Sequence, residues 1–392
     1  MIFALKNTQM QLQEILKKLV SFNVLGGESN LAIVSWIENY LDSYGIISHR
    51  VYNDDKTKAS LHCVFGPLTD GGVVLSGHLD VVPVEGQNWD TNPFELIAKG
   101  DGNLYGRGSC DMKGFVACCL AIVPQLVKAN LKKPIFFAFS YDEEIGCLGA
   151  PDLIDAILDF YNPKPQFAII GEPTLLQPVI GQKGICVLET TVNGSAGHSS
   201  RILQEVSAVH EAAKLVVWLE NKIKSLIESG SVDPRFNPPH TSIHVGQFNG
   251  GIAPNIIADK ARFLWDVRCI PKDTVAKILK DFEAYCATVI TTKKVLFPDF
   301  TIETKMQSPA VPPLDTSETS EILKLTQKIT NKQSFETVSY AAEAGQFSER
   351  GIESIICGPG SIAQAHRENE FVAIRQLDEC KVMLENLMNE FS

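Results

Sequence analysis

The chain has 392 residues, which is long enough for two or more domains with complete hydrophobic cores. Its 46 acidic and 35 basic residues give a formal net charge of −11, which argues against nucleic acid and against an anionic membrane surface as partners. The hydrophobic fraction of 45% is ordinary for a globular protein, and no apolar stretch approaches the length of a membrane span.

The cysteines and the N-terminus indicate a cellular compartment. The ten cysteines include no C-x-x-C pair and stand mostly within apolar runs, so we expect buried, reduced thiols. The apolar run at Met1–Leu5 is too short for a secretory signal peptide. We therefore expect a cytoplasmic protein.

The first part of the chain alternates helices and strands. Apolar spacing predicts a helix over 11–20, and Ser29 and Asn30 are expected to cap a second helix that ends near Leu41. The further elements expected are strands over 48–52, 60–65 and 73–78, loop and hairpin structure over 89–94 and 100–108, a helix over 112–127, and buried strands over 134–140 and 167–173.

His78 and Asp80 follow the apolar run that begins at Val73. In extended geometry residues two apart point to the same side, so Asp80 can orient the imidazole of His78 as carboxylates commonly do for metal-bound histidines. A single His-x-Asp is nevertheless more often part of a surface turn. Asp111 has a similar alternative, because it stands where a helix N-cap is expected.

Carboxylates also follow the two later buried strands. Glu143 and Glu144 follow the strand at 134–140, and Glu172 follows the strand at 167–171 after a glycine. In mostly parallel sheets the ligands bind outside the carboxyl ends of the strands. We therefore expect these side chains to meet His78 at one edge of a sheet flanked by helices, in an α/β fold.

The pattern changes near Lys183. The expected order over 183–308 is β-α-β-β-α-β, which is that of a ferredoxin-like domain. From Ser317 the strand and helix alternation resumes, and His366 follows a last apolar strand over 354–360. We therefore expect one domain made of 1–182 and 309–392, with residues 183–308 inserted as a second domain.

Two imidazoles and three carboxylates form a mixed ligand set that suits zinc, cobalt or manganese. These residues are His78, Asp111, Glu144, Glu172 and His366. They exceed the needs of one tetrahedral ion but fit two ions if one carboxylate bridges. Glu143 then remains free to act as a general base.

The chain resembles the co-catalytic dizinc deacetylase and exopeptidase family over nearly its whole length. The matching segments are SGHLDVVP (76–83), LYGRGSCDMKG (104–114), YDEEIG (141–146), IGEPT (170–174), GSAGHSS (194–200), residues 255–268 and GPGSIAQAH (358–366). After Ser200 the chain departs from the family's usual Pro and Gly-Val-Asn-Ala residues and has Arg-Ile-Leu-Gln instead.

The resemblance implies specific roles for the two metal sites. His78 and Glu172 would bind one zinc ion, Glu144 and His366 the other, and Asp111 would bridge them. Asp80 would orient His78, Glu143 would be the general base, and a cis peptide bond would follow Asp111. Cobalt or manganese could replace the two zinc ions of each subunit.

The same resemblance implies that the inserted domain is a lid and dimerisation domain. His198 would then stabilise the oxyanion in the active site of a partner subunit. Arg268, with Asn255, would hold the free carboxylate of the substrate, although a single arginine on a strand is as often structural. The other histidines, His49, His62, His210, His240 and His244, match no motif and are expected to be surface or core residues.

The C-terminal segments resemble most the family members that deacetylate N2-acetyl-L-ornithine. Ala342-Glu343-Ala344 stands where the desuccinylases carry a Gly-rich Thr-Ser-Asp segment, so Glu343 is a candidate contact to the substrate amine. Succinyl-diaminopimelate or a dipeptide with a free carboxylate is the alternative substrate. A metal-free binding protein is the alternative of another class, and a serine hydrolase is disfavoured because no G-x-S-x-G motif occurs.

Overall fold

The computed structural model describes residues 10–392, which divide into two compact units. The first unit runs to Gly181 and also contains 314–336 and 342–392, whereas the second contains 182–313 and 337–341. The apolar run at Met1–Leu5 lies outside the described residues. Whether the units act as a catalytic domain and a lid stays a prediction.

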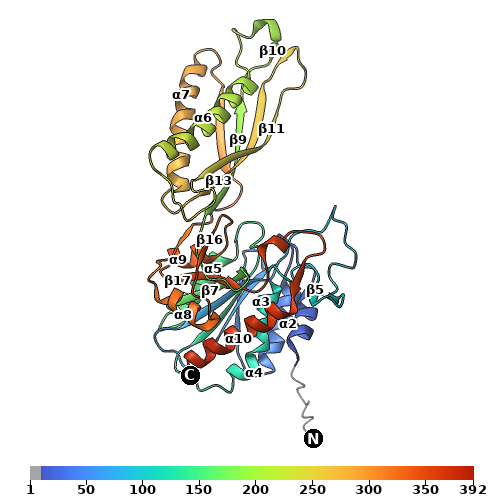
Figure 1. The fold of residues 1–392 in the computed structure, drawn as a ribbon. Coiled ribbons are helices and arrows are strands. Elements are labelled where there is room, and N and C mark those ends of the chain that lie inside the picture. Colours follow the sequence, from blue (N-terminus) through green and yellow to red (C-terminus); the bar gives the residue numbers. More distant parts are fainter. Residues whose placement is uncertain (1–9) are drawn as a thin grey trace. The chain divides into compact units, whose positions relative to one another are not determined.

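The first unit is built on a nine-stranded sheet, which Figure 1 shows as a twisted layer. In spatial order the strands are β1 (Ser48–Tyr52), β2 (Ala59–Phe65), β6 (Ile135–Ser140), β3 (Val73–His78), β7 (Phe167–Pro173), β17 (Glu353–Gly358), β8 (Val179–Gln182) and β15 (Leu314–Asp315), with β16 (Glu336–Val338) beside β8. The four central strands β6, β3, β7 and β17 are parallel, whereas β1 pairs with β2, β2 with β6 and β8 with β17 in antiparallel fashion. The expected mostly parallel sheet is confirmed.

Helices cover both faces of this sheet. The larger group packs on one face through the main hydrophobic core and comprises α1 (Leu12–Val20), α2 (Leu31–Asp42), α3 (Lys113–Ala121), α4 (Val123–Leu126), α8 (Glu321–Thr330) and α10 (Ile374–Glu390). The other face is covered by α5 (Ala150–Phe160) and α9 (Ala344–Glu349). A small separate sheet consists of β18 (Phe371–Ala373), β5 (Asn103–Tyr105) and β4 (Ile97–Ala98).

The second unit contains an antiparallel sheet of four strands with the order β11-β13-β9-β14. In this order the first strand of the unit lies between the third and the fourth, as the split β-α-β pattern requires. The elements are β9 (Gly184–Asn193), α6 (Ala208–Glu228), β11 (Ser242–Gly250), β13 (Lys260–Cys269), α7 (Val275–Lys294) and β14 (Thr301–Met306), with a short ribbon of β10 (Gly197–His198) and β12 (Ile256–Ile257). Both helices pack on the sheet through one apolar core.

Two local expectations differ from the structure. The helix expected over 112–127 is divided at Ile122, because Pro124 has no N–H to continue the ladder. Asn30 stands at the N-cap position of α2 but makes no capping bond, since its side-chain amide pairs with the backbone N–H and C=O of Ala59. All ten cysteines are free and buried, as expected.

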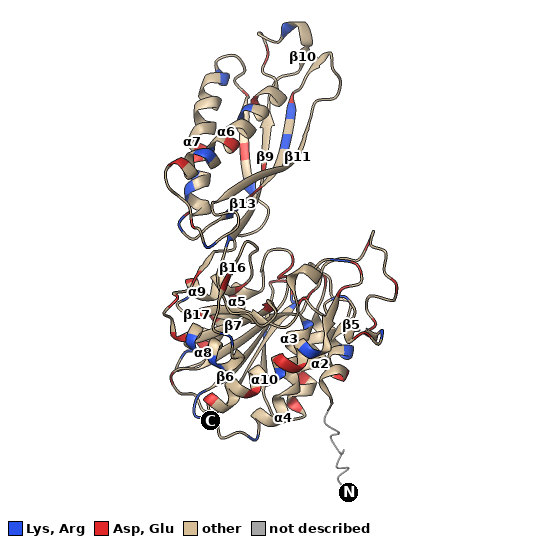
Figure 2. Ribbon diagram, viewed as in Figure 1, with Lys and Arg blue, Asp and Glu red and all other residues tan. Residues whose placement is uncertain are grey.

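The charged residues of both signs are mixed along the elements, as Figure 2 shows for α6 and α7. Within the part of the chain that the structure describes, no helix has the length and apolar character needed to cross a membrane.

Candidate metal centre

Strand β3 places His78 at the carboxyl end of the central sheet. The ring is 1% exposed, and its Nδ1 lies 2.9 Å from the main-chain oxygen of Asp80. A ring nitrogen that faces a carbonyl carries the proton, which leaves Nε2 as the free ligand atom. This Nε2 lies 3.2 Å from Asp111 Oδ1 and 3.9 Å from Glu172 Oε1.

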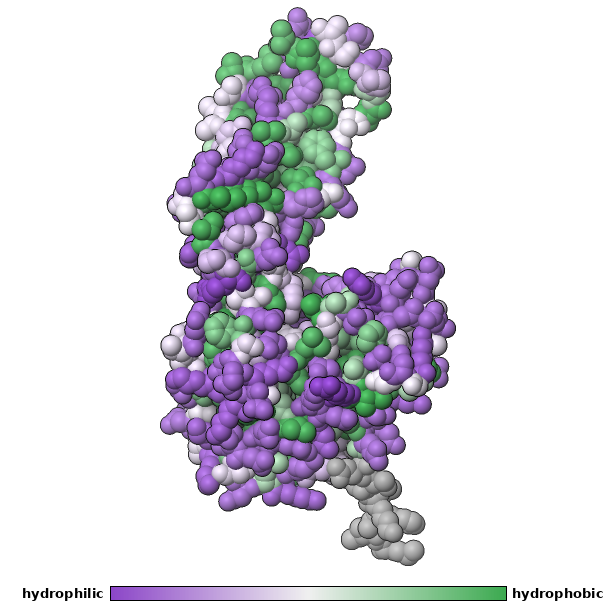
Figure 3. All heavy atoms as spheres, in the orientation of Figure 1, coloured by the Kyte–Doolittle hydropathy of each residue, from purple (hydrophilic) through white to green (hydrophobic). Residues whose placement is uncertain are grey.

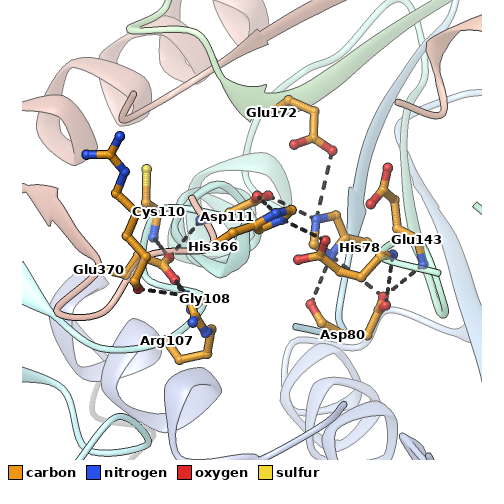
Figure 4. A network of polar contacts seen from close by, with 12 residues as sticks. His78, Asp80, Arg107, Gly108, Cys110, Asp111, Glu143, Glu172, His366 and Glu370 are labelled. Carbon is orange, nitrogen blue, oxygen red and sulfur yellow. Dashed lines mark hydrogen bonds and ion pairs between the residues drawn. The ribbon is translucent and has the colours of Figure 1, made fainter. Parts of the chain in front are cut away.

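The carboxylate of Asp80 has a different set of partners from those the sequence suggested. Its nearest oxygen is 3.6 Å from His78 Nδ1, so the hydrogen bond to the ring is made by the main chain. The two carboxylate oxygens instead accept the backbone N–H groups of Glu143 and Glu144, both at 3.1 Å (Figure 4). Asp80 therefore fixes the turn that carries both glutamates.

Asp111 lies between the two histidines. Its Oδ2 is 3.6 Å from His366 Nε2, and the side chain does not cap α3, whose N-cap position is Met112. The cis peptide bond expected after Asp111 is confirmed between Asp111 and Met112. On the far side, His366 Nε2 is 2.9 Å from Glu144 Oε2.

Glu172 is delivered by β7 directly after Gly171. A Cβ atom at Gly171 would lie 2.0 Å from Cγ of Phe115, so only glycine allows the strand to pack against α3 here. The Oε1 atom of Glu172 is buried and has no hydrogen-bond partner within the described chain. Buried polar atoms are normally satisfied, so this oxygen fits the role of a ligand to a cation.

The electrostatics of the cluster also favour a cation. Burial, together with the charges of Asp111 and Glu143, raises the pKa of Glu172 well above its usual value. Burial is likewise the largest cause that raises the pKa of Glu143 to about 8. Carboxyl groups crowded in this way hold protons that a divalent cation can replace.

The donor atoms fit a metal centre. Ligand atoms of His78, Asp111 and Glu144 all lie within 4.8 Å of one another, and so do those of His78, Glu143 and Glu172. Imidazole nitrogens mixed with carboxylate oxygens suit zinc and neighbouring transition metals. The structure thus brings all five predicted ligands into one cluster, and the assignment of each to a particular ion stays a prediction.

The three candidates of the inserted domain lie in the second unit. His198 on β10 pairs with Ile256 on β12, so it stands next to Asn255. Arg268 pairs with Ile185 near one end of β13, whereas the ribbon of β10 and β12 adjoins the opposite end of β13, at Lys260. A ten-residue strand is about 30 Å long, so His198 and Arg268 of one chain do not approach each other.

The side chains of His198 and Arg268 have local partners. His198 Nδ1 lies 2.8 Å from the hydroxyl of Ser200, and the histidine is exposed. Arg268 Nε donates to Asp266 Oδ2 at 3.0 Å and its side chain is 38% exposed. An exposed arginine with one carboxylate partner keeps donors that a substrate carboxylate can use.

Glu343 is buried at the N-cap position of α9, with 1% exposure. Its carboxylate accepts hydrogen bonds from the hydroxyls of Ser76, at 3.0 Å, and Ser140. It lies near Glu143, whose pKa it helps to raise. A role for Glu343 in binding the substrate stays a prediction.

Arg107 and Glu370 are buried charged residues of this site that the motifs did not single out. Each is 1% exposed, and Arg107 Nη1 donates to Glu370 Oε2 at 2.8 Å. In the sequence, acidic residues follow His366, and this pattern could have indicated a residue that supports the site. Glu368 and Glu370 fit the pattern equally well, but Glu368 is exposed in the structure.

Comparison with known proteins places the chain in a family. The model of the peptidase family M20/M25/M40 matches residues 74–390. The chain belongs to this family. An acetylornithine deacetylase of Myxococcus xanthus is 31% identical over 392 residues, which cover 99% of each chain. One of Pasteurella multocida (strain Pm70) is 29% identical over 370 residues, covering 93% of this chain and 92% of that one.

The solved structures agree with the fold. An M20 family metallo-carboxypeptidase of Sulfolobus solfataricus has a TM-score of 0.77 at 16% identity and covers 97% of this chain and 99% of that one. The resemblance inferred from the sequence motifs is confirmed. M20/M25/M40 membership, together with the cluster at His78, identifies the chain as a metal-dependent hydrolase.

Proposed function

We propose that the protein removes the acetyl group from N2-acetyl-L-ornithine and releases L-ornithine and acetate. The observation that carries this proposal is the meeting of two histidines and three carboxylates beside the side chain of Glu143. The full-length similarity to acetylornithine deacetylases supports the choice of substrate. The reaction would serve arginine biosynthesis in the cytoplasm.

The proposed centre holds two zinc ions per subunit, which cobalt or manganese can replace. When bound, such a pair lowers the pKa of a water molecule and polarises the amide carbonyl. His78 and Glu172 would hold one ion, Glu144 and His366 the other, and Asp111 would contact both.

Glu143 is proposed as the proton carrier. Its carboxylate takes a proton from the attacking water and returns it to the leaving nitrogen of ornithine, as a general base and then a general acid. Cys147 Sγ donates to Glu143 Oε1 at 3.2 Å, and Asp80 holds the backbone N–H of Glu143. These two contacts restrict the positions that the carboxylate of Glu143 can occupy.

Residues of the second unit are proposed to bind the substrate in a homodimer. His198 would stabilise the oxyanion from the partner subunit, and Arg268, with Asn255, would bind the α-carboxylate. The long separation of His198 and Arg268 along β13 supports a division of these roles between two subunits. Glu343 would contact the substrate's side-chain amine.

The surface of the second unit supports dimerisation. Strand β11 lies at the edge of its sheet and pairs only with β13 among the described strands, and open edges readily accept another strand. Figure 3 shows apolar residues gathered on the visible face of this unit. The large apolar residues exposed in this unit include Leu203, Val217, Phe248 and Ile252.

A comparison of kcat/KM across acyl amino acids tests the substrate. We expect N2-acetyl-L-ornithine to be preferred over succinyl-diaminopimelate and over dipeptides with a free carboxylate. A preference of more than about tenfold for the succinyl compound, or about 1.4 kcal/mol in transition-state binding, would overturn the proposal.

A further inference from the structure

The loop that carries Asp111 is held by a single carboxylate from the C-terminal part of the chain. Glu370 Oε1 accepts the backbone N–H groups of Cys110, at 2.8 Å, and of Asp111, at 3.1 Å. Its Oε2 accepts the N–H of Gly108 at 3.0 Å and Nη1 of Arg107 at 2.8 Å. Figure 4 shows both oxygens directed into this loop, so the carboxylate is saturated with donors.

Arg107 extends the same network to the segment that carries His366. Its Nη1 also donates to the carbonyl oxygen of Arg367 at 3.3 Å, and its Nη2 donates to Gln87 Oε1 at 2.6 Å. Gln87 in turn donates to the carbonyl oxygen of His366 at 2.9 Å. His366 has a φ of 62°, a left-handed conformation that persists only where its surroundings enforce it.

We propose that Glu370, paired with Arg107, is a positioning residue that sets the bridging ligand Asp111 against His366. Glu370 is not among the five proposed metal ligands. It acts through the backbone N–H of Asp111 and, by way of Arg107 and Gln87, through the carbonyl groups of Arg367 and His366. The inference rests on the proposed metal centre. It adds a pair of residues that fixes the distance between two ligands of that centre, Asp111 and His366.

The contacts of the buried pair Glu370 and Arg107 go beyond those of a structural ion pair. A buried ion pair by itself is weak evidence for stability, because desolvation offsets the attraction. Both Glu370 oxygens accept backbone N–H groups of the loop that carries Asp111, and Arg107 Nη1 donates to the carbonyl oxygen of Arg367, next to His366. Outer contacts of this kind change metal affinity about 10- to 100-fold when they are removed.

The test is titration of the metal-free protein with Zn²⁺, followed by calorimetry, together with the visible absorption spectrum of the Co²⁺ form. Glu370→Gln keeps the shape of the side chain but presents an amide NH₂ to backbone donors. We expect the affinity for at least one of the two ions to fall about 10- to 100-fold and the Co²⁺ spectrum to change. Glu370→Asp, which keeps the charge, should retain more of the affinity.

The matched control is Glu368→Gln. Glu368 stands two residues away, is exposed, and accepts a single backbone N–H, that of Asn88, at 2.8 Å. Metal binding by this variant should equal that of the wild type. The inference is overturned if folded Glu370→Gln binds both ions as the wild type does, even when its Tm is lower.

A second pair of variants covers the case in which Glu370→Gln does not fold. Glu370→Asp and Arg107→Lys are then titrated in the same way, and unchanged affinity in both would overturn the inference. Because the titration uses no acetylornithine, a wild type that binds two ions without hydrolysing this substrate would contradict the proposed function alone.

Discussion

His366 Nε2 lies 2.9 Å from Glu144 Oε2, although 222 positions separate the two residues in the chain. Glu144 follows β6, and His366 follows β17, which lies three strands away in the sheet order. Only the folded sheet brings them together. This contact, with Asp111 beside it, is the geometric basis for the second proposed ion.

Replacement of Glu143 by Ala should stop turnover but preserve the metal centre. Removal of a general acid–base group lowers rates typically by about 10²- to 10⁴-fold, so we expect kcat to fall by this amount. The zinc content should remain that of the wild type, because Glu143 is not assigned as a ligand. Steady-state kinetics and metal analysis on one preparation check both statements, and a near-normal kcat would remove Glu143 as the base.

Replacement of Asp80 by Asn tests the hydrogen bonds that its carboxylate accepts from the backbone of Glu143 and Glu144. The amide can accept only one of the N–H groups that the carboxylate accepts now, so one half-buried donor loses its partner. We expect the free energy of unfolding to fall by about 1–3 kcal/mol and kcat to fall as well. Urea unfolding and kinetics measure the two effects.

One result of this experiment would contradict the proposed role of Asp80 in catalysis. If Asp80→Asn lowers stability but leaves kcat unchanged, the contact with the backbone of Glu143 and Glu144 has no part in catalysis. Ser21→Ala serves as a control, because its hydroxyl bonds to the carbonyl of Lys18 in an exposed position outside the cluster.

Co-expression of two inactive variants tests whether His198 acts across subunits. A Glu143→Ala subunit can supply His198 to a His198→Ala subunit, which retains its own Glu143. Random pairing would then restore about a quarter of the wild-type number of active sites. Separately purified variants should remain inactive, and a co-expressed mixture without activity would place His198 in its own subunit or outside the site.

His62 should make stability depend on pH. Burial, with a smaller effect from His49, lowers the pKa of His62 to about 4 in the folded protein, against 6.5 in the unfolded chain. The unfolded state therefore takes up the proton first, so the stability present above pH 6.5 is lost as the pH falls towards 4. The loss from this residue is on the order of 3 kcal/mol.

A variant isolates the contribution of His62. Urea unfolding of metal-free protein at several pH values between 7.5 and 4 should show a shallower loss for His62→Phe than for the wild type. The other titrating groups cancel in this difference, because they are present in both proteins. Parallel curves for the two proteins would contradict the assigned pKa.

Much of the fold follows from local sequence. The continuous apolar runs within 134–140 and 167–173 predicted buried parallel strands, and the β-α-β-β-α-β order of the second unit follows from spacing alone. Glu172 was predictable because a glycine between a buried strand and a carboxylate marks a close approach, here to Phe115. The division of the helix at Ile122 could have been predicted from Pro124.

Other parts of the site depend on tertiary contacts that no local pattern contains. Glu370 and Glu368 are equivalent in sequence, and only the packing of β18 against β5 selects Glu370 for the Asp111 loop. The spacing of His78 and Asp80 predicted a carboxylate partner for the ring. In the structure that carboxylate accepts the backbone N–H of Glu143 instead, and Nδ1 of the ring bonds to the main-chain oxygen of Asp80.

Anomalous diffraction at the zinc edge from crystals of the zinc-loaded protein tests the central claim most directly. We expect two peaks about 3.5–4 Å apart, with Asp111 in contact with both. His78 and Glu172 should lie at one peak, and Glu144 and His366 at the other. No peak at this cluster, or peaks that Asp111 does not contact, would contradict this claim.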